Sequence, residues 1–131
     1  MDAAQAIADL TEISPQVKQV AVITADGSPG GSNVAAEAAE RLADGARRLV
    51  EAAEELRPGV AQLEAATQAG SVFVVREGDR MIAATTSPEP TVGLVFYDLK
   101  TCLRSIDEPK PKSKPRTRAG KPPEETDDAA A

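Results

Sequence analysis

Acid–base chemistry in this chain would have to come from carboxylates, because the sequence has no histidine and a single cysteine, Cys102. Histidine-dependent triads and histidine-containing zinc sites are therefore excluded. Asp26, Asp79 and Asp98 stand where turn or helix-surface roles explain them, so we assign them no catalytic role. Cys102 is expected to be a small core residue of the last helix. The inventory predicts a protein that is not an enzyme and that holds no cofactor and no metal.

The charge of the chain is uneven. Residues 1–106 carry 15 acidic and 9 basic side chains, and residues 107–131 carry six of each kind. An acidic body repels phosphates, which argues against a nucleic-acid groove. No apolar run approaches the roughly 20 residues that cross a bilayer, and the start of the chain lacks the basic residues of a signal peptide. We expect a cytoplasmic protein with no nucleic-acid partner and no transmembrane segment.

The spacing of apolar residues predicts an α+β fold of order α-β-β-α-β-β-β-α. The helices are expected at 3–13, 34–56 and 92–106. Their caps are expected at Asp2, at Ser32 or Asn33, and at Thr91. The strands are expected at 17–25, 30–33, 60–68, 71–77 and 80–86. The second strand should be short and irregular, because glycine and proline form strands poorly.

The long predicted helix, 34–56, carries two sizes of residue along one face. Alanine recurs every seven residues, and leucine recurs three positions later: Ala39, Ala46 and Ala53, with Leu42, Leu49 and Leu56. Small residues let a second helix approach, and leucines supply apolar area, so this face suits another helix. An amphipathic helix lying on the chain's own sheet would look similar, and both interpretations stay open. Gly45 in this helix and Gly93 in the last one are interpreted as packing positions.

The composition also bears on oligomeric state and on the end of the chain. The core has few large side chains, so burying the helix face against a second copy would help to stabilise the fold. Residues 107–131 form a basic, proline-rich stretch with an acidic end and no large apolar residue. We predict one domain at 1–106 and a disordered tail at 107–131. A solubilising role for the tail is favoured over contact with an anionic lipid, a nucleic acid or an acidic partner.

The order of the elements and the residues at their joints resemble the roadblock / dynein light chain family, which includes bacterial regulators of Ras-like small GTPases. The resemblance spans about Ala6 to Ile106 and rests on folding motifs, none of them catalytic. These are the 20–24 strand entering Asp26-Gly27, the Ala/Leu helix, the Gly78-Asp79 hairpin and the 91–99 stretch. The resemblance implies a five-stranded antiparallel sheet with the long helix on one face and the two terminal helices on the other. Ser-Pro-Gly-Gly at 28–31 departs from the family's second strand.

The same resemblance implies a homodimer in which the 60–68 strand pairs with its counterpart across a two-fold axis, beneath the paired long helices. That strand contains no Lys or Pro, residues that prevent an exposed edge strand from pairing with another chain. Their absence agrees with an edge that a second copy covers. The predicted dimer interface comprises Ala39, Leu42, Ala46, Leu49, Ala53, Leu56, Leu63, Ala65 and Thr67.

For function, the resemblance implies a non-catalytic regulator or scaffold that binds a Ras-like small GTPase and modulates its nucleotide cycle. The chain has no P-loop motif and so is not the GTPase. The candidate partner-binding residues are the polar ones on the outer face of the long helix: Glu40, Arg41, Asp44, Arg47, Arg48, Glu51, Glu54 and Glu55. Arg47 or Arg48 could reach a nucleotide as an arginine finger. The favoured interpretation is a solvated helix face with ion pairs such as Glu51–Arg47.

Two other functions compete with GTPase regulation. The alternative is a structural adaptor subunit of a larger complex, which the sequence hardly separates from a GTPase regulator. A small-ligand sensor is disfavoured, because few polar groups converge among the small aliphatic core positions.

Overall fold

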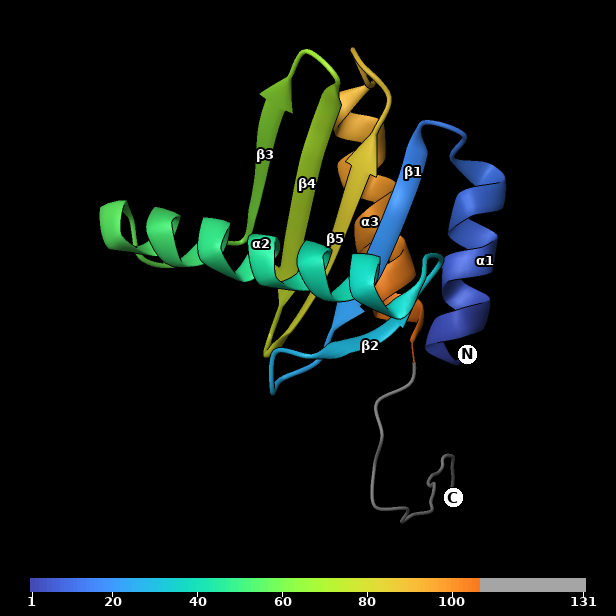
Figure 1. The fold of residues 1–131 in the computed structure, drawn as a ribbon, viewed down its shortest axis with the longest axis horizontal. Helices are drawn as coiled ribbons and strands as arrows, with labels where there is room; N and C mark the ends of the chain where they lie inside the picture. Colours follow the sequence, from blue (N-terminus) through green and yellow to red (C-terminus); the bar gives the residue numbers. More distant parts are fainter. Residues whose placement is uncertain (107–131) are drawn as a thin grey trace, which may run out of the picture.

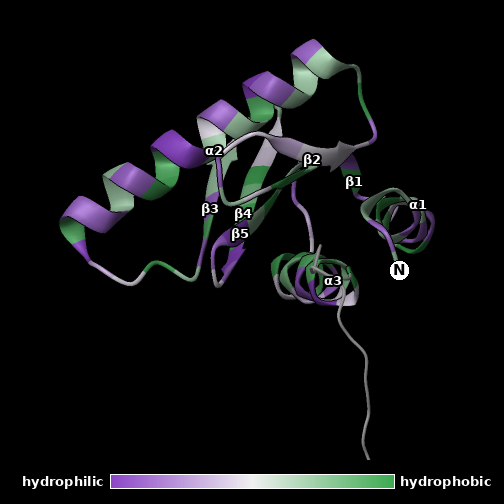
Figure 2. Ribbon diagram, turned by 90° about the horizontal axis from the view of Figure 1, so that it is seen from below, coloured by the Kyte–Doolittle hydropathy of each residue, from purple (hydrophilic) through white to green (hydrophobic). Residues whose placement is uncertain are grey.

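The computed structural model describes residues 1–106, and the predicted tail at 107–131 lies outside the described residues. The elements follow the predicted order. They are α1 (Ala3–Ile13), β1 (Val17–Ile23), β2 (Pro29–Ser32), α2 (Ala36–Leu56), β3 (Gln62–Thr67), β4 (Gly70–Glu77), β5 (Arg80–Thr86) and α3 (Val92–Ser105). The strands form one antiparallel sheet in the order β2-β1-β5-β4-β3. The long helix α2 crosses one face, and α1 and α3 cover the other, which confirms the expected fold (Figures 1 and 2).

The two faces of the sheet are packed with different residues. On the α1/α3 face, large side chains form the main core, in which the rings of Phe73 and Phe96 meet edge to face at 4.9 Å. Cys102 is buried in this cluster, as predicted. On the α2 face, a smaller cluster joins Ala43, Ala46 and Val50 to short side chains of the sheet. The alanines let α2 lie close to the sheet, but they bury little area for each residue.

One of the predicted caps forms, and two do not. The Asp2 carboxylate accepts the Gln5 backbone N–H at 2.8 Å and so caps α1. The helix α2 begins two residues later than predicted, and Ala35 precedes it without a side-chain cap, so the predicted caps at Ser32 and Asn33 are wrong. Thr91 precedes α3, but its side chain caps nothing.

Asn33 is used by the sheet instead of the helix. Its Oδ1 accepts the backbone N–H of Val20 at 2.8 Å, and its Nδ2 donates to the Lys18 carbonyl at 3.0 Å. The side chain thus continues the pairing of β1 where β2 has ended at Ser32. Because Val20 is fully buried, its N–H needs this partner. The short strand β2 pairs irregularly with β1, as its glycine and proline content predicted.

The local geometry requires glycine at position 70, whereas no packing contact within the chain requires it at positions 45 and 93. At Gly70, φ is +141°, and a Cβ there would lie 2.0 Å from the Thr86 carbonyl oxygen, so only glycine fits where β4 begins beside the end of β5. Gly45 and Gly93 are different, since a Cβ at either position would meet no atom within 4 Å. Their interpretation as packing positions is wrong for the single chain, because the space beside each of them is open.

Candidate functional site

One side of α2 presents an uncovered apolar surface, which we call the leucine side and define by Leu42, Gly45, Leu49 and Val72. It lines an open hollow of about 500 Å³, with Arg41 and Arg48 at its rim. Leu49 is 36% exposed, although it is a large apolar residue in the middle of a helix. Apolar area left open in this way is typical of a surface that another protein covers.

The strand β3 continues the leucine side to the edge of the sheet. Leu63 and Ala65 pair with Val74 and Val72 of β4, and alternation along the strands places all four on the face that α2 crosses. Among the described residues, β3 pairs only with β4, so its outer edge is open. Val72, which lines the leucine-side hollow, pairs with Ala65 of β3, so the leucine side reaches the strand next to this open edge.

The structure divides the predicted dimer interface into two groups. Ala39 and Ala46 are 3% and 1% exposed in the single chain, and Ala46 belongs to the cluster that α2 forms with the sheet, so neither alanine is open to a second helix. For these alanines the own-sheet interpretation is right, because the helix rests on its smallest residues. The other predicted interface residues keep accessible surface: Leu42, Leu49, Ala53, Leu56, Leu63, Ala65 and Thr67. Of these, Leu56 is 81% exposed at the end of the helix.

The outward face of α2 carries a charged triplet. Asp44 accepts hydrogen bonds from Arg47 at 3.1 Å and from Arg48 at 2.5 Å, three and four residues further along the helix. The Arg48 bond and charge lower the pKa of Asp44, and Asp44 in turn raises the pKa of Arg48. Arg47 pairs with Asp44, so the predicted Glu51–Arg47 pair is wrong. The Arg48 side chain is 76% exposed and bends back along the helix.

The remaining predicted partner-binding residues lie around this triplet. Glu40, Arg41 and Glu51 are exposed, and none of them forms an ion pair with another described residue. The candidate residues therefore stay on one helix face, as their spacing predicted. The structure does not join them to a cavity able to enclose a small molecule, since the hollows beside them are open.

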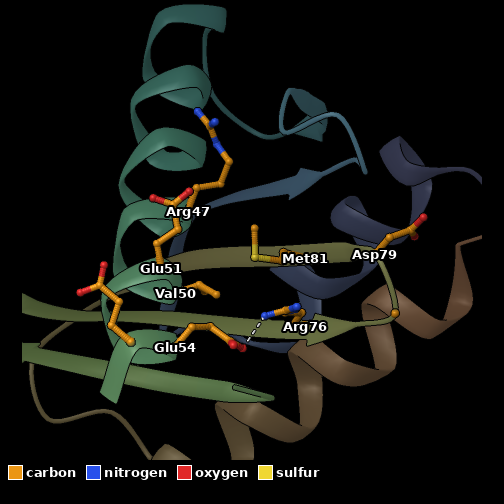
Figure 3. Close-up of a pocket in the computed structure, with 9 residues that line it drawn as sticks. Arg47, Val50, Glu51, Glu54, Arg76, Asp79 and Met81 are labelled. Atoms are coloured by element: carbon orange, nitrogen blue, oxygen red, sulfur yellow. Dashed lines mark hydrogen bonds and ion pairs between the residues drawn. The ribbon is translucent and has the colours of Figure 1, made fainter. Parts of the chain in front are cut away.

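The other side of α2 borders a second hollow of about 600 Å³, which we call the acidic groove (Figure 3). Val50 and Met81 give it an apolar floor. Its rim is charged and comprises Arg47, Glu51, Glu54, Glu55, Arg76 and Asp79. The β4–β5 hairpin supplies Arg76, Asp79 and Met81, which sequence reasoning missed. Alternation along β4 offered a signal for Arg76, because it falls on the same face as Val72 and Val74.

Glu54 closes one end of the acidic groove. Its carboxylate accepts the backbone N–H of Val60 at 2.8 Å and that of Gly59 at 3.2 Å, and it pairs with Arg76 at 2.9 Å. The backbone bonds and the Arg76 charge lower the pKa of Glu54. This carboxylate thus ties the end of α2 to the loop before β3 and to β4, so Glu54, which the sequence suggested for partner binding, has a structural role.

Asp26 and Asp98, two of the aspartates that the sequence assigned to turns or helix surfaces, lie in different surroundings. Asp26 accepts from Thr24 Oγ1 at 2.5 Å and from Ser28 Oγ at 2.6 Å, so it holds a turn, and these bonds lower its pKa to about 2. Asp98 is 7% exposed, which corrects its expected place on the helix surface. Residues 1–106 contain no group of three His, Cys, Asp or Glu side chains that could hold a metal ion. Within the same range, no helix is long and apolar enough to cross a membrane.

Comparison with known proteins identifies the fold through structure. No protein-family pattern and no curated protein matches the sequence. A roadblock/LC7 domain from Streptomyces avermitilis superposes with a TM-score of 0.70 at 16% identity, over 80% of this chain and 94% of that one. MglB from Myxococcus xanthus superposes with a TM-score of 0.60 at 15% identity, over 76% and 87%. The gliding protein MglB of Thermus thermophilus gives 0.61 at 12% identity, over 79% and 84%. The chain has the fold of the roadblock/LC7 domains.

Proposed function

We propose that the protein is a non-catalytic, cytoplasmic homodimer that binds a Ras-like small GTPase and modulates its nucleotide cycle. The observation that carries this proposal is the uncovered leucine side beside an open strand edge, in a chain with the roadblock/LC7 fold. The resemblance stated from the sequence supplies the class of partner. The likeness of the fold to MglB supports the proposal.

The dimer is argued from what the single chain leaves open. Fully burying a leucine side chain contributes roughly 1.5–3 kcal/mol, and a two-fold contact would bury Leu42 and Leu49 from both copies. Pairing of β3 with its counterpart would satisfy the backbone groups of the open edge. The small residue Gly45 lies between the leucines and would let the second helix approach closely.

Size-exclusion chromatography with light scattering, repeated by sedimentation over a dilution series, tests the dimer. We expect twice the chain mass for the natural protein and a monomer for Leu49→Arg. Leu94→Arg is the matched control, because Leu94 is an exposed leucine of α3 on the opposite face of the sheet and is 49% exposed. A natural protein that stays monomeric and folded, or two variants that behave alike, would refute the proposed interface.

The GTPase contact is argued from the charged face of α2. Glu40, Arg41, Arg48 and Glu51 point outward, and in a two-fold dimer the two helices would present these side chains on one combined surface. Arg48 is exposed, and among the described residues its side chain forms hydrogen bonds with Asp44 alone, so it is the arginine best placed to exchange its carboxylate partner for a phosphate. Asp44 therefore competes with any anionic ligand of Arg48.

A pull-down with a GTPase encoded near this protein, in each nucleotide state, tests partner binding. GTP hydrolysis with and without the protein, and with Arg48→Ala, then tests whether Arg48 acts on the nucleotide. Arg57→Ala serves as a control, since Arg57 is an exposed arginine beyond the end of α2. Absence of binding in every nucleotide state, with constant recovery of another partner, would reject GTPase regulation and favour the adaptor function.

A further inference from the structure

Three carboxylates around the acidic groove are exposed. Glu51 and Glu55 come from α2, and Asp79 comes from the β4–β5 turn. None of the three forms a hydrogen bond or ion pair with another described residue, whereas Glu54 and Arg76 neutralise each other at 2.9 Å. Figure 3 shows Glu51 and Asp79 on opposite sides of Met81. The groove therefore joins an apolar floor to a net negative rim.

The chain itself contains a segment of matching charge. Between Lys110 and Lys121 six residues are Lys or Arg, and none is acidic. Two prolines in that stretch, Pro111 and Pro115, favour an extended chain and lower the entropy lost on binding. The remaining residues are small or polar, so they fit a shallow open groove.

The described part of the chain ends at Ile106, on the other face of the sheet from α2 and beside the β4–β5 hairpin that borders the groove (Figure 2). Arg80 donates to the backbone carbonyls of Leu103 and Ile106, each at 3.4 Å, and Arg104 pairs with Glu77 at 2.8 Å. These bonds fix the end of α3 to the β4–β5 hairpin, and Asp79 is the residue next to Arg80. Four extended residues span about 13 Å and fifteen span about 50 Å, while packed layers lie about 10 Å apart. The basic segment is therefore long enough to pass around the hairpin to the α2 face.

We propose that the basic segment 110–121 docks in the acidic groove of its own chain, between α2 and the β4–β5 turn. Lysines and arginines of the segment pair with Glu51, Glu55 and Asp79, and its prolines lie over Val50 and Met81. A partner that approaches this side of α2 must displace the segment, which makes it a built-in competitor. The docking does not depend on the GTPase proposal, because it needs neither a nucleotide nor a second protein.

A spin label on the full-length chain tests the docking. The variant Ser113→Cys places the label between two lysines and leaves every basic residue in place. Cys102 should stay unlabelled, because it is 5% exposed and burial raises its pKa to about 11. In the isotope-labelled protein we expect the amide signals of Glu55 and Asp79 to lose most of their intensity. The signal of Ala69, at the opposite end of the sheet, should keep its intensity.

The controls test whether the docking depends on charge and whether the segment docks on its own chain. Replacing the rim carboxylates with amides, in Glu51→Gln/Glu55→Gln/Asp79→Asn, should restore the groove signals, as should about 1 M salt, where charges are screened within about 3 Å. The matched variant Glu12→Gln/Glu37→Gln/Glu89→Gln removes as many exposed carboxylates elsewhere and should keep the loss. Unperturbed groove signals in the labelled protein would overturn the proposal. So would signal loss that appears only when isotope-labelled and spin-labelled chains are mixed, because the segment would then dock on another copy.

Discussion

The open space beside Gly45 makes Gly45→Ala the sharpest single test of the long helix. Glycine inside a helix is about 1 kcal/mol less favourable than alanine. A Cβ at this position meets no atom within 4 Å, so nothing in the chain offsets the gain. In the dissociated chain we therefore expect the free energy of unfolding to rise by about 1 kcal/mol, which corresponds to a melting temperature about 4 °C higher for a domain of this size.

The same methyl group should weaken association of two chains. Gly45 lies between Leu42 and Leu49 on the leucine side, where the second helix is proposed to pack. Urea unfolding of samples diluted below the dimer dissociation constant gives the first effect, and sedimentation equilibrium gives the second. We expect the substitution to stabilise the monomer and to raise the dissociation constant, two results of opposite sign from one methyl group.

Gly93→Ala separates these effects. Gly93 is also free of contacts, but it lies in the first turn of α3 on the opposite face, so alanine there should stabilise modestly and leave the dissociation constant unchanged. If Gly45→Ala destabilised the dissociated chain, the helix face would not be open as described. An unchanged dissociation constant would place the interface away from the middle of α2.

The remaining predictions concern single residues outside the interface. Asn33→Ala should lower the free energy of unfolding in a urea titration by about 1–3 kcal/mol, because it leaves the buried N–H of Val20 unpaired; an unchanged free energy of unfolding would contradict this role of Asn33. Asp26→Ala should destabilise at neutral pH. The folded pKa of Asp26, about 2, lies below its ordinary 3.8, so its stabilisation is present above 3.8 and is lost as the pH falls through about 2. The difference between the two proteins should therefore close over that range in acid-unfolding curves. The Cys102 thiol, whose pKa burial raises to about 11, should resist a thiol reagent at about pH 8 until the chain is unfolded, and rapid reaction of the folded protein would contradict its burial.

Local patterns in the sequence were sufficient for the element order and the sheet. Tight glycine turns and alternating apolar residues predicted β3, β4 and β5, and the Asp2 cap was predicted from its position before the first helix. The cap of α2 was not predictable in this way. Asn33 suits both a helix cap and a strand edge, and only the end of β2 beside Val20 decides between them.

The candidate site shows the same limit. A heptad of Ala and Leu indicates one apolar face of the helix, but part of that face can pack on the chain's own sheet and part on a second chain. The spacing alone does not say which residues point toward the sheet, because it does not fix the rotation of α2 about its own axis. The structure places Ala39 and Ala46 inward and leaves Leu49 accessible. The acidic groove was missed because its rim joins α2 to the β4–β5 turn, residues far apart in sequence that meet only through the fold.

The position of β5 between β1 and β4 has a consequence for how the protein is made. The central seam joins β1 to β5, and β2, α2, β3 and β4 lie between them in the chain. Such distant pairing requires closure of a long loop and should be the slow step of folding. Until β5 leaves the ribosome, the newborn β1 has an apolar, unpaired edge that other chains can join. The period of greatest aggregation risk should therefore end with synthesis of β5. Shortening the time between the synthesis of β1 and that of β5 should raise the yield of folded protein.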